Sequence, residues 1–253
     1  MADLYEEHSA IQVREDDVIM LQDSVSVEDT FRLFLDDIPL AQIIASPDQL
    51  RELGAGFVIC EGLSDHVEDV RVSKNEIRVY AKTDAPAQLS AQRKVEYELR
   101  ASGCIGVRGL PKAVVSSLAI ARVEVFRVIR QVESEVWKKT GGVHCSVLFQ
   151  DGQLLVRSSD IGRHNTIDKI VGFAVLNGIN LSQCVIACTG RQPAGMIAKV
   201  ANAGVPIIVS KAAATDAGIL LADRSNVTLI CFARGERFTV YSHPERIAGL
   251  VKE

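Results

Sequence analysis

No apolar stretch in this chain of 253 residues approaches the ~18 consecutive residues that a membrane-spanning helix needs. The N-terminus also lacks the basic and then apolar pattern of a secretory signal, because it begins Met-Ala-Asp-Leu-Tyr-Glu-Glu. A net charge of −4 gives no general attraction to nucleic acid or to an acidic membrane. These absences predict a cytoplasmic protein whose partners include neither a membrane nor a nucleic acid.

Several ligand-binding motifs are missing too. The chain has no P-loop and no dinucleotide-binding glycine fingerprint. Cys184 and Cys188 are spaced too widely for a Cys-x-x-Cys zinc knuckle, so we expect both in the core. His144-Cys145 faintly resembles the histidine of zinc deaminases, but neither the glutamate two residues on nor a Pro-Cys-x-x-Cys follows. We therefore expect no metal site.

The chain has six cysteines and is far too long to need a disulfide framework. Apolar surroundings predict that five of them are buried and reduced, namely Cys60, Cys145, Cys184, Cys188 and Cys231. Cys104 instead lies in a glycine-rich loop, Ser102-Gly103-Cys104-Ile105-Gly106-Val107-Arg108-Gly109. An exposed thiol beside an arginine favours a reactive thiolate, and an unreactive loop cysteine is the competing interpretation.

A hydrophobic content of 47% allows a sizeable core, in one large or two smaller domains. Residues 10–45 alternate between apolar and polar, with a hairpin predicted at Asp36-Asp37. A helix is predicted to begin at Ser46 and Pro47 and to end at Gly62. Further predicted elements are strands over 67–82 and 93–100, a polar linker over 84–92 and one long helix over 116–139.

Strands and helices then alternate to the end of the chain. The predicted strands cover 143–149, 153–158, 184–189, 206–210, 227–232 and 237–241, and the predicted helices cover 163–177, 193–203 and 215–224. This order predicts an α/β layer architecture with a largely parallel sheet. We place a smaller N-terminal region at residues 1–110, ending in the Cys104 loop, and the α/β region at residues 111–253.

The segment Asp160-Ile-Gly-Arg-His-Asn-Thr-Ile-Asp-Lys169 gathers charges where a strand ends and a helix begins. Free backbone N–H groups and the helix dipole favour an anion such as phosphate there. A capped helix with solvated charges is the alternative interpretation. Two more strand-to-helix turns follow, and in an open α/β sheet all three meet at one edge. The side chains predicted to share one anionic ligand are Arg163, His164, Thr189, Arg191, Lys211 and Thr215.

Five motifs resemble the FdhD/NarQ family, the accessory sulfurtransferases of formate dehydrogenase. They are Thr140-Gly-Gly-Val-His144, Asp160-Ile-Gly-Arg-His-Asn165 with Asp168-Lys169, Thr189-Gly-Arg191, Ala201-Asn-Ala-Gly-Val-Pro206 and Arg237-Phe-Thr-Val-Tyr241. Ile38-Pro39-Leu40, Ser46-Pro47 and Leu53-Gly-Ala-Gly-Phe57 agree as well, so the resemblance covers roughly residues 30–247.

This resemblance implies a cytidine-deaminase-like three-layer α/β/α domain without the metal site, a smaller α+β N-terminal domain, and a homodimer. It also implies a function: persulfide sulfur passes from a cysteine desulfurase to the molybdenum cofactor, bis(molybdopterin guanine dinucleotide), before insertion into apo formate dehydrogenase. GDP is a natural surrogate for that cargo. The family's C-terminal cofactor-binding stretch corresponds here to Phe232, Ala233, Arg234, Gly235, Glu236 and Arg237.

The Cys104 loop departs from the family pattern Cys-Gly-x-Cys-Gly. If the loop is aligned from its start, Cys104 is the first cysteine and one residue is inserted; if it is aligned from its end, Arg108 replaces the second cysteine and Ile105 the first. The two-cysteine motif is broken in both cases. A single persulfide on Cys104 is still chemically possible, so we expect a sulfurtransferase with Cys104 as the sulfur carrier. The alternative is a non-catalytic carrier that holds the guanine-dinucleotide cofactor.

Overall fold

A computed structural model describes residues 4–81 and 111–250, and its centre is a six-stranded sheet in the order β13-β12-β11-β10-β8-β9. The strands are β8 (His144–Gln150), β9 (Gln153–Asp160), β10 (Cys184–Cys188), β11 (Ile207–Ser210), β12 (Thr228–Arg234) and β13 (Arg237–Val240). In this sheet only β10–β11 and β11–β12 are parallel, so the prediction of a largely parallel sheet is wrong. Short turns join β8 to β9 and β12 to β13, and such turns can link only antiparallel strands.

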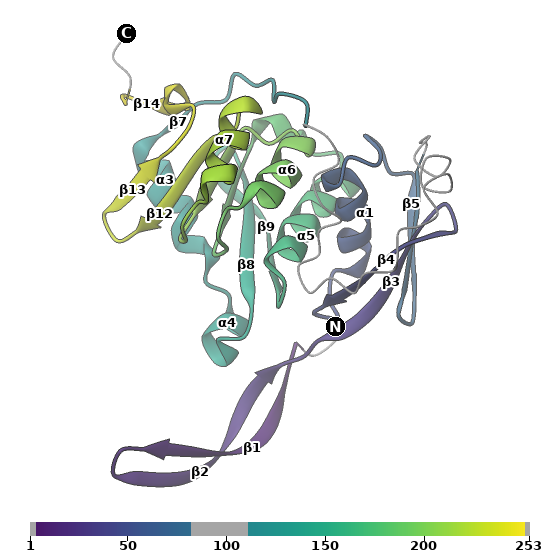
Figure 1. Ribbon diagram of the computed structural model, residues 1–253, viewed down its shortest axis with the longest axis vertical. Helices are drawn as coiled ribbons and strands as arrows, with labels where there is room; N and C mark the ends of the chain where they lie inside the picture. The colour runs from purple at the N-terminus through teal and green to yellow at the C-terminus, as the bar shows by residue number, and fades with distance from the viewer. Residues whose placement is uncertain (1–3, 82–110, 251–253) are drawn as a thin grey trace.

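Helices cover both faces of this sheet (Figure 1). The helix α3 (Arg122–Ile129) lies on one face, and α5 (Arg163–Leu176), α6 (Ala194–Asn202) and α7 (Asp216–Arg224) lie on the other. Side chains alternate along β10, so Val185 packs in the cluster around α3 while Ile186 packs in the cluster around α5 and α6. The predicted mixed α/β class is confirmed, and the likeness to cytidine deaminases stays a prediction. None of the helices in residues 4–81 and 111–250 is long and apolar enough to cross a membrane.

A second sheet, of four strands, is built by the N-terminal part of the chain. Its order is β4-β3-β6-β5, and α1 (Leu50–Cys60) lies between it and α5 (Figure 1). The strands are β3 (Asp29–Leu35), β4 (Ile38–Ala45), β5 (Asp69–Ser73) and β6 (Glu76–Tyr80). The hairpin predicted at Asp36-Asp37 is confirmed. The strand predicted at 93–100 and the linker at 84–92 lie outside the described residues, and the domain boundary at residue 110 stays a prediction.

Two glycines bring α1 and α5 into direct backbone contact. A Cβ atom on Gly56 would lie 1.7 Å from the carbonyl oxygen of Asp168, and one on Gly172 would lie 1.8 Å from the carbonyl oxygen of Glu52. No side chain fits at either position. This helix pair therefore joins the two sheets, and one apolar cluster runs through both of them.

The long helix predicted over residues 116–139 is wrong. The segment forms β7 (Ile120–Ala121), which pairs with β14 (Ile247–Ala248), then α3, the 3-10 helix η1 (Arg130–Val132) and α4 (Glu135–Thr140). The chain is extended at Glu133, and Ser134 caps α4 by accepting a hydrogen bond from the N–H of Trp137 at 3.1 Å. A serine cap stabilises a new helix start, while the apolar spacing continues unchanged across the break.

The predicted start of α1 at Ser46 and Pro47 is also wrong, because the helix begins at Leu50. Ser46 is buried, and its backbone N–H donates to Asp160 Oδ2 at 3.1 Å. Ser46 therefore contacts Asp160, more than a hundred positions away in the chain, instead of capping a helix that starts beside it.

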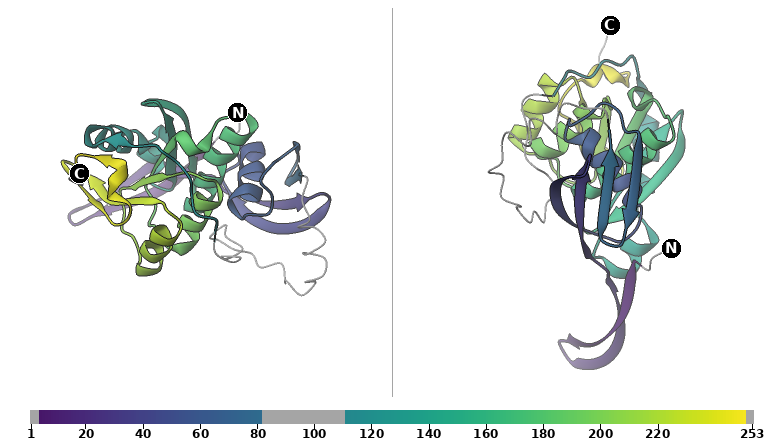
Figure 2. Two further views of the ribbon diagram at one scale, coloured as in Figure 1. Left: turned by 90° about the horizontal axis from the view of Figure 1, so that it is seen from above. Right: turned by 90° about the vertical axis from the view of Figure 1, so that its right-hand side faces the viewer.

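The first two strands form a separate hairpin, which we call the arm. β1 (Tyr5–Arg14) and β2 (Asp17–Ser26) pair along their whole length and extend away from the rest of the molecule (Figures 1 and 2). The base of the arm is held by α4, where Ser26 Oγ donates to Thr140 Oγ1 at 2.8 Å and Lys139 Nζ donates to the Tyr5 hydroxyl at 2.6 Å.

Candidate functional site

The strand-to-helix turns of the six-stranded sheet meet at one edge. β8 is antiparallel to both of its neighbours, so His144 at its start lies opposite Asp160 at the end of β9, and Ser146 lies opposite Cys188 at the end of β10. The parallel pairs place the ends of β11 and β12 at the same edge. We call this the carboxyl edge. The three turns predicted from the sequence all lie on it.

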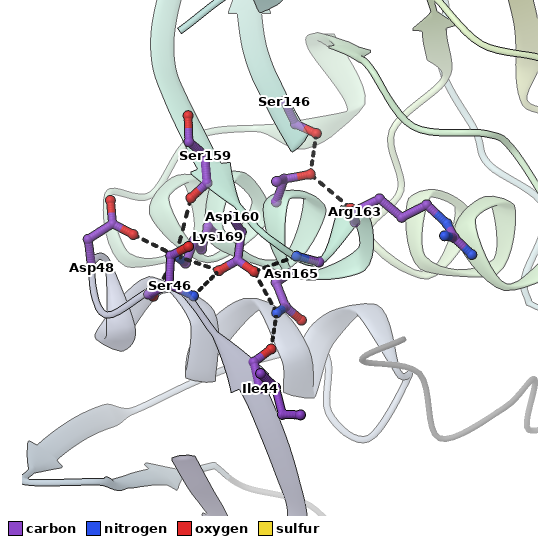
Figure 3. A network of polar contacts seen from close by, with 11 residues as sticks. Ile44, Ser46, Asp48, Ser146, Ser159, Asp160, Arg163, Asn165 and Lys169 are labelled. Atoms are coloured by element: carbon purple, nitrogen blue, oxygen red, sulfur yellow. Dashed lines mark hydrogen bonds and ion pairs between the residues drawn. The ribbon is translucent and has the colours of Figure 1, made fainter. Parts of the chain in front are cut away.

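Asp160 organises the turn that precedes α5 (Figure 3). Its Oδ1 atom accepts hydrogen bonds from the Gly162 N–H and from Asn165 Nδ2, both at 2.8 Å. Its Oδ2 atom accepts from the Ser46 N–H and lies 2.8 Å from Lys169 Nζ. Asn165 Nδ2 also donates to the Ile44 carbonyl at 2.8 Å. Asp160 therefore fixes the start of α5 against the segment that follows β4.

The lysines of this region are buried and paired. Lys169 Nζ lies 2.6 Å from Asp48 Oδ1, in addition to Asp160, and donates to the Ser46 carbonyl at 3.1 Å. Asp168, the residue before Lys169 in α5, lies 2.9 Å from Lys199 Nζ of α6, which also contacts Glu61 Oε1 at 2.8 Å. The alternative of solvated charges is wrong for Asp160, Asp168 and Lys169, because interior partners hold all three.

The two arginines of the carboxyl edge, Arg163 and Arg191, are placed differently from these buried lysines. The side chain of Arg163 extends away from the Asp160 network (Figure 3) and passes over Gly190, where a Cβ atom would lie 2.9 Å from Arg163 Cβ. In the described part of the chain, Arg163 Nε is buried without a hydrogen-bond partner. Burial lowers the pKa of Arg163, and the neighbouring Arg191 lowers it further. Two guanidinium groups thus share one region of positive potential.

Two histidines lie beside these arginines. His164 is only 4% exposed, and among the described residues its Nδ1 atom has no hydrogen-bond partner. Burial lowers the pKa of His164 to about 3, with Lys199, Arg163 and His144 contributing in the same direction. Burial and then Arg163 also lower the pKa of His144. Both imidazoles are therefore neutral at pH 7 and can donate or accept a hydrogen bond.

The turn after β10 is fixed by side chains that the sequence did not single out. Gln192 Nε2 and Ser210 Oγ both donate to the Gly190 carbonyl, at 2.8 and 2.7 Å. Thr189 Oγ1 accepts from the Cys145 N–H at 3.0 Å and lies 3.1 Å from His144 Nδ1. His144 was noted in the sequence for a faint likeness to the zinc deaminases and as the end of the Thr140–His144 motif. The only sequence signal for Ser210 is its place at the end of β11, and for Gln192 its place in the turn between β10 and α6.

Lys211 and Thr215 lie on the carboxyl edge but are engaged by protein groups. Lys211 Nζ lies 2.6 Å from Glu133 Oε1, and this hydrogen bond lowers the pKa of Glu133. Thr215 caps α7, and its Oγ1 atom accepts from the Gly218 N–H at 3.1 Å. Lys211 and Thr215, like Thr189, therefore bind protein groups. Arg163 instead lies within electrostatic reach of Arg191 and of His164.

The stretch from Phe232 to Arg237 forms the irregular hairpin between β12 and β13. Phe232 has a positive φ of 52°, and its N–H donates to the Ala212 carbonyl at 3.1 Å, next to Lys211. The Arg234 guanidinium lies 5.9 Å from the centre of the Phe232 ring. Ala233 is fully buried in the cluster around α3, which directs its side chain to the core instead of a ligand.

Cys104 lies outside the described residues. The other five cysteines are all buried and free, as predicted. Within residues 4–81 and 111–250, no three His, Cys, Asp or Glu side chains are grouped closely enough to hold a metal ion.

Comparison with known proteins finds relatives that match most of this chain. The sequence model of the FdhD/NarQ family matches residues 26–248. The chain is 36% identical to a sulfur carrier protein FdhD of Methanothermobacter thermautotrophicus, over 80% of this chain and 83% of the relative. It is 31% identical to a protein of the same name from Wolinella succinogenes, over 94% and 85%. A crystal structure described as a formate dehydrogenase accessory protein from Desulfotalea psychrophila covers 97% of this chain and 100% of its own, with a TM-score of 0.79 and 26% identity.

Proposed function

Because this chain belongs to the FdhD/NarQ family, we propose that it is a sulfur carrier for the maturation of formate dehydrogenase. The relatives named as sulfur carriers and the accessory protein of similar fold support this function. The finer proposal is that sulfur comes from a cysteine desulfurase and goes to the molybdenum cofactor, bis(molybdopterin guanine dinucleotide). In this proposal the cofactor is cargo, received and then released to apo formate dehydrogenase in the cytoplasm.

The observation that supports cargo binding is the unpartnered cation at the carboxyl edge. Arg163 is partly buried, its Nε atom has no hydrogen-bond partner among the described residues, and it lies within electrostatic reach of Arg191. A phosphate or diphosphate supplies the acceptor oxygens and the negative charge that such a pair lacks. The N-terminus of α5, with Gly162 before Arg163, adds a favourable dipole.

Cys104 is the proposed carrier of the sulfur. Its thiolate attacks the outer sulfur of the desulfurase persulfide, a new sulfur–sulfur bond forms on Cys104, and the cysteine of the desulfurase leaves as a thiolate. Arg108 in the same loop favours the thiolate form of Cys104. The broken two-cysteine motif leaves one thiol in this loop, so the persulfide on Cys104 is the only covalent intermediate of the proposal.

Calorimetry with GDP tests the binding half of this proposal. Arg163→Ala and Arg191→Ala are each expected to weaken GDP binding by ~1.5–3 kcal/mol, which is about ten- to hundredfold. Arg224→Ala is the matched control, because Arg224 is exposed in the last turn of α7. Absence of measurable GDP affinity in the unmodified protein would refute the proposed cargo site.

Experiments on Cys104 distinguish the sulfur-carrier role from the alternative, a non-catalytic carrier of the cofactor. After incubation with a cysteine desulfurase and cysteine, the sulfur carrier gains the mass of one sulfur atom on Cys104, whereas a non-catalytic cofactor carrier gains none. Cys104→Ala should then fail to activate formate dehydrogenase in a cell that lacks its own accessory protein, yet still bind GDP. Full complementation by Cys104→Ala would favour the non-catalytic carrier.

A further inference from the structure

The fold explains the glycines of the Thr140–His144 motif but not its histidine. Gly141 ends α4 with a positive φ of 63°. Gly142 lies against the base of the arm, where a Cβ atom would come within 2.6 Å of the Ser26 hydroxyl oxygen. Neither glycine accounts for His144, whose half-exposed ring lies at the carboxyl edge, where the proposed cargo site is.

The ring of His144 is held in place through one of its two nitrogens. Its Nδ1 atom lies 3.1 Å from Thr189 Oγ1, which also accepts a hydrogen bond from the Cys145 N–H at 3.0 Å. In the described part of the chain, Nε2 of the same ring makes no hydrogen bond. Thr189 precedes Gly190, over which the side chain of Arg163 passes. The position of the ring and the available Nε2 atom suit contact with an anion that Arg163 binds.

The surroundings of His144 oppose its protonation in the free protein. Burial lowers the pKa of His144, Arg163 at the start of α5 lowers it further, and Asp160 at the end of β9 acts in the opposite direction. His164 is also within electrostatic reach of His144, but its own ring is neutral. The Asp160 carboxylate is already bonded to Lys169, so the charge of Arg163 is the one that lacks a partner. An anion bound to Arg163 offsets this charge and thereby favours a proton on His144.

We propose that His144 is a further ligand contact of the carboxyl edge, which takes up a proton from solvent when the phosphate groups of the cargo bind and then donates a hydrogen bond to them through Nε2. Both ring nitrogens of an imidazolium are donors. The Nδ1–H then donates to Thr189 Oγ1, whose two lone pairs serve His144 and the Cys145 N–H, and the Nε2–H is left for a phosphate oxygen. This role rests on the proposed function, because it requires an anion at Arg163.

Proton uptake by His144 opposes the usual effect of pH on phosphate binding. A terminal phosphate is itself protonated near pH ~6, so a site made of arginines alone binds GDP more weakly as the pH falls. His144 acts in the other direction. Above its pKa in the complex neither state holds the proton, and below its pKa in the free protein both states do. Between these two values, lowering the pH favours the complex.

Calorimetry of GDP binding to the full chain tests this role with four variants. At pH 6.5, titrations in two buffers of different ionisation enthalpy measure the number of protons taken up. His144→Gln should lower this number by up to about one proton per GDP, and from pH 8 to pH 6 its affinity should fall about tenfold relative to that of the unmodified protein. Thr189→Ser keeps the hydroxyl and should retain the uptake, while Thr189→Val should lose it. His66→Gln is the matched control, because His66 is exposed and lies between α1 and β5, away from the carboxyl edge.

Circular dichroism verifies that every variant is folded, and NMR of the histidine rings gives a second readout on the unmodified protein. The ring of His144 should titrate at a higher pH in the GDP complex than in the free protein. An unchanged titration of this ring, equal proton uptake in the unmodified protein and His144→Gln, or full uptake in Thr189→Val each overturns the role of His144 while leaving the proposed cargo site intact. Absence of GDP binding in the unmodified protein instead overturns the proposed cargo site and this role together.

Discussion

At the scale of single residues, burial determines the protonation state of His164 in the candidate site. Its ring is almost fully enclosed at the start of α5, and Lys199, Arg163 and His144 surround it with positive or potentially positive groups. Protonation would place another cation beside these groups, in an interior that solvates charge poorly. The folded protein therefore strongly favours the neutral imidazole.

This burial predicts a loss of stability in mild acid. An unfolded histidine titrates near pH 6.5, whereas the folded pKa of His164 is about 3, so the unfolded chain takes up the proton first as the pH falls. The stabilisation is fully present above pH 6.5, and lowering the pH from 6.5 to 5.0 should remove about 2 kcal/mol through His164. Urea unfolding at pH 7.5 and 5.0 measures this loss of folding stability. His164→Gln should reduce this pH dependence, while the exposed His66→Gln should not. Identical pH dependence in the protein and its His164→Gln variant would contradict this account.

The cysteines give a second test at this scale. Burial raises the pKa of Cys145, Cys184 and Cys188 to about 11 and that of Cys231 to about 12, and the pKa of Cys60 is raised as well. Limited iodoacetamide at neutral pH should therefore label Cys104 first, because the thiolate is the reactive form. Peptide mass spectrometry identifies the adduct. In concentrated urea the order should disappear, and equal labelling of all six thiols in the folded protein would rule out an exposed Cys104 loop.

The sequence was sufficient to place the cations at the carboxyl edge, because residues at strand ends share that edge in an α/β sheet. The sequence did not show that Lys169 and Asp168 form interior ion pairs whereas Arg163 does not. The difference depends on partners far away in the chain, Asp48 for Lys169 and Lys199 for Asp168. No local pattern reports such a partner, so interior ion pairs and ligand-facing cations look alike in the sequence.

At the scale of elements, glycines allow α1 and α5 to come into direct backbone contact. Gly56 and Gly172 face the backbone of the opposite helix, at distances where even a methyl group would overlap a carbonyl oxygen. Because the obstacle is backbone on both sides, a rotamer change cannot relieve the overlap. The start of α5, which presents Arg163, keeps its position relative to the N-terminal sheet through this contact.

Gly172→Ala should consequently destabilise the protein by about 3 kcal/mol or more, because the two helices must separate to admit one methyl group. Gly178→Ala is the matched control. Its Cβ would meet open space, and the positive φ of 66° there predicts a cost of only about 1 kcal/mol. Urea denaturation compares the two variants. Equal losses would mean that the helices can move apart freely.

Element boundaries were predicted well where a turn has its own chemistry and poorly where tertiary contacts decide. The hairpin at Asp36-Asp37 was predicted correctly, since both residues accept positive φ angles. The break before Ser134 was missed because apolar spacing continues through it. The mixed sheet was missed because strand direction follows from which strands become neighbours, a property of the whole fold.

At the scale of the whole molecule, polar and apolar contacts connect the two sheets. The apolar cluster includes residues from both, and the Asp160 network joins the segment after β4 to the start of α5 (Figure 3). The Lys199 cluster adds a second buried connection, from Glu61 at the end of α1 to α6. We therefore expect the two sheets to unfold together in a single cooperative transition.

Asp160→Ala is the sharpest test of this coupling. The substitution removes the acceptor for the Gly162, Asn165 and Ser46 donors, and it leaves the buried Lys169 with Asp48 as its remaining carboxylate. Breaking a buried ion pair from one side should cost ~3–5 kcal/mol, because the remaining charge is poorly compensated. Asp69→Ala, which removes an exposed ion pair with Arg71, should change stability little. Calorimetry should show one transition in both variants, shifted to a much lower temperature only for Asp160→Ala. Two separated transitions would show that the sheets are not held together by these contacts.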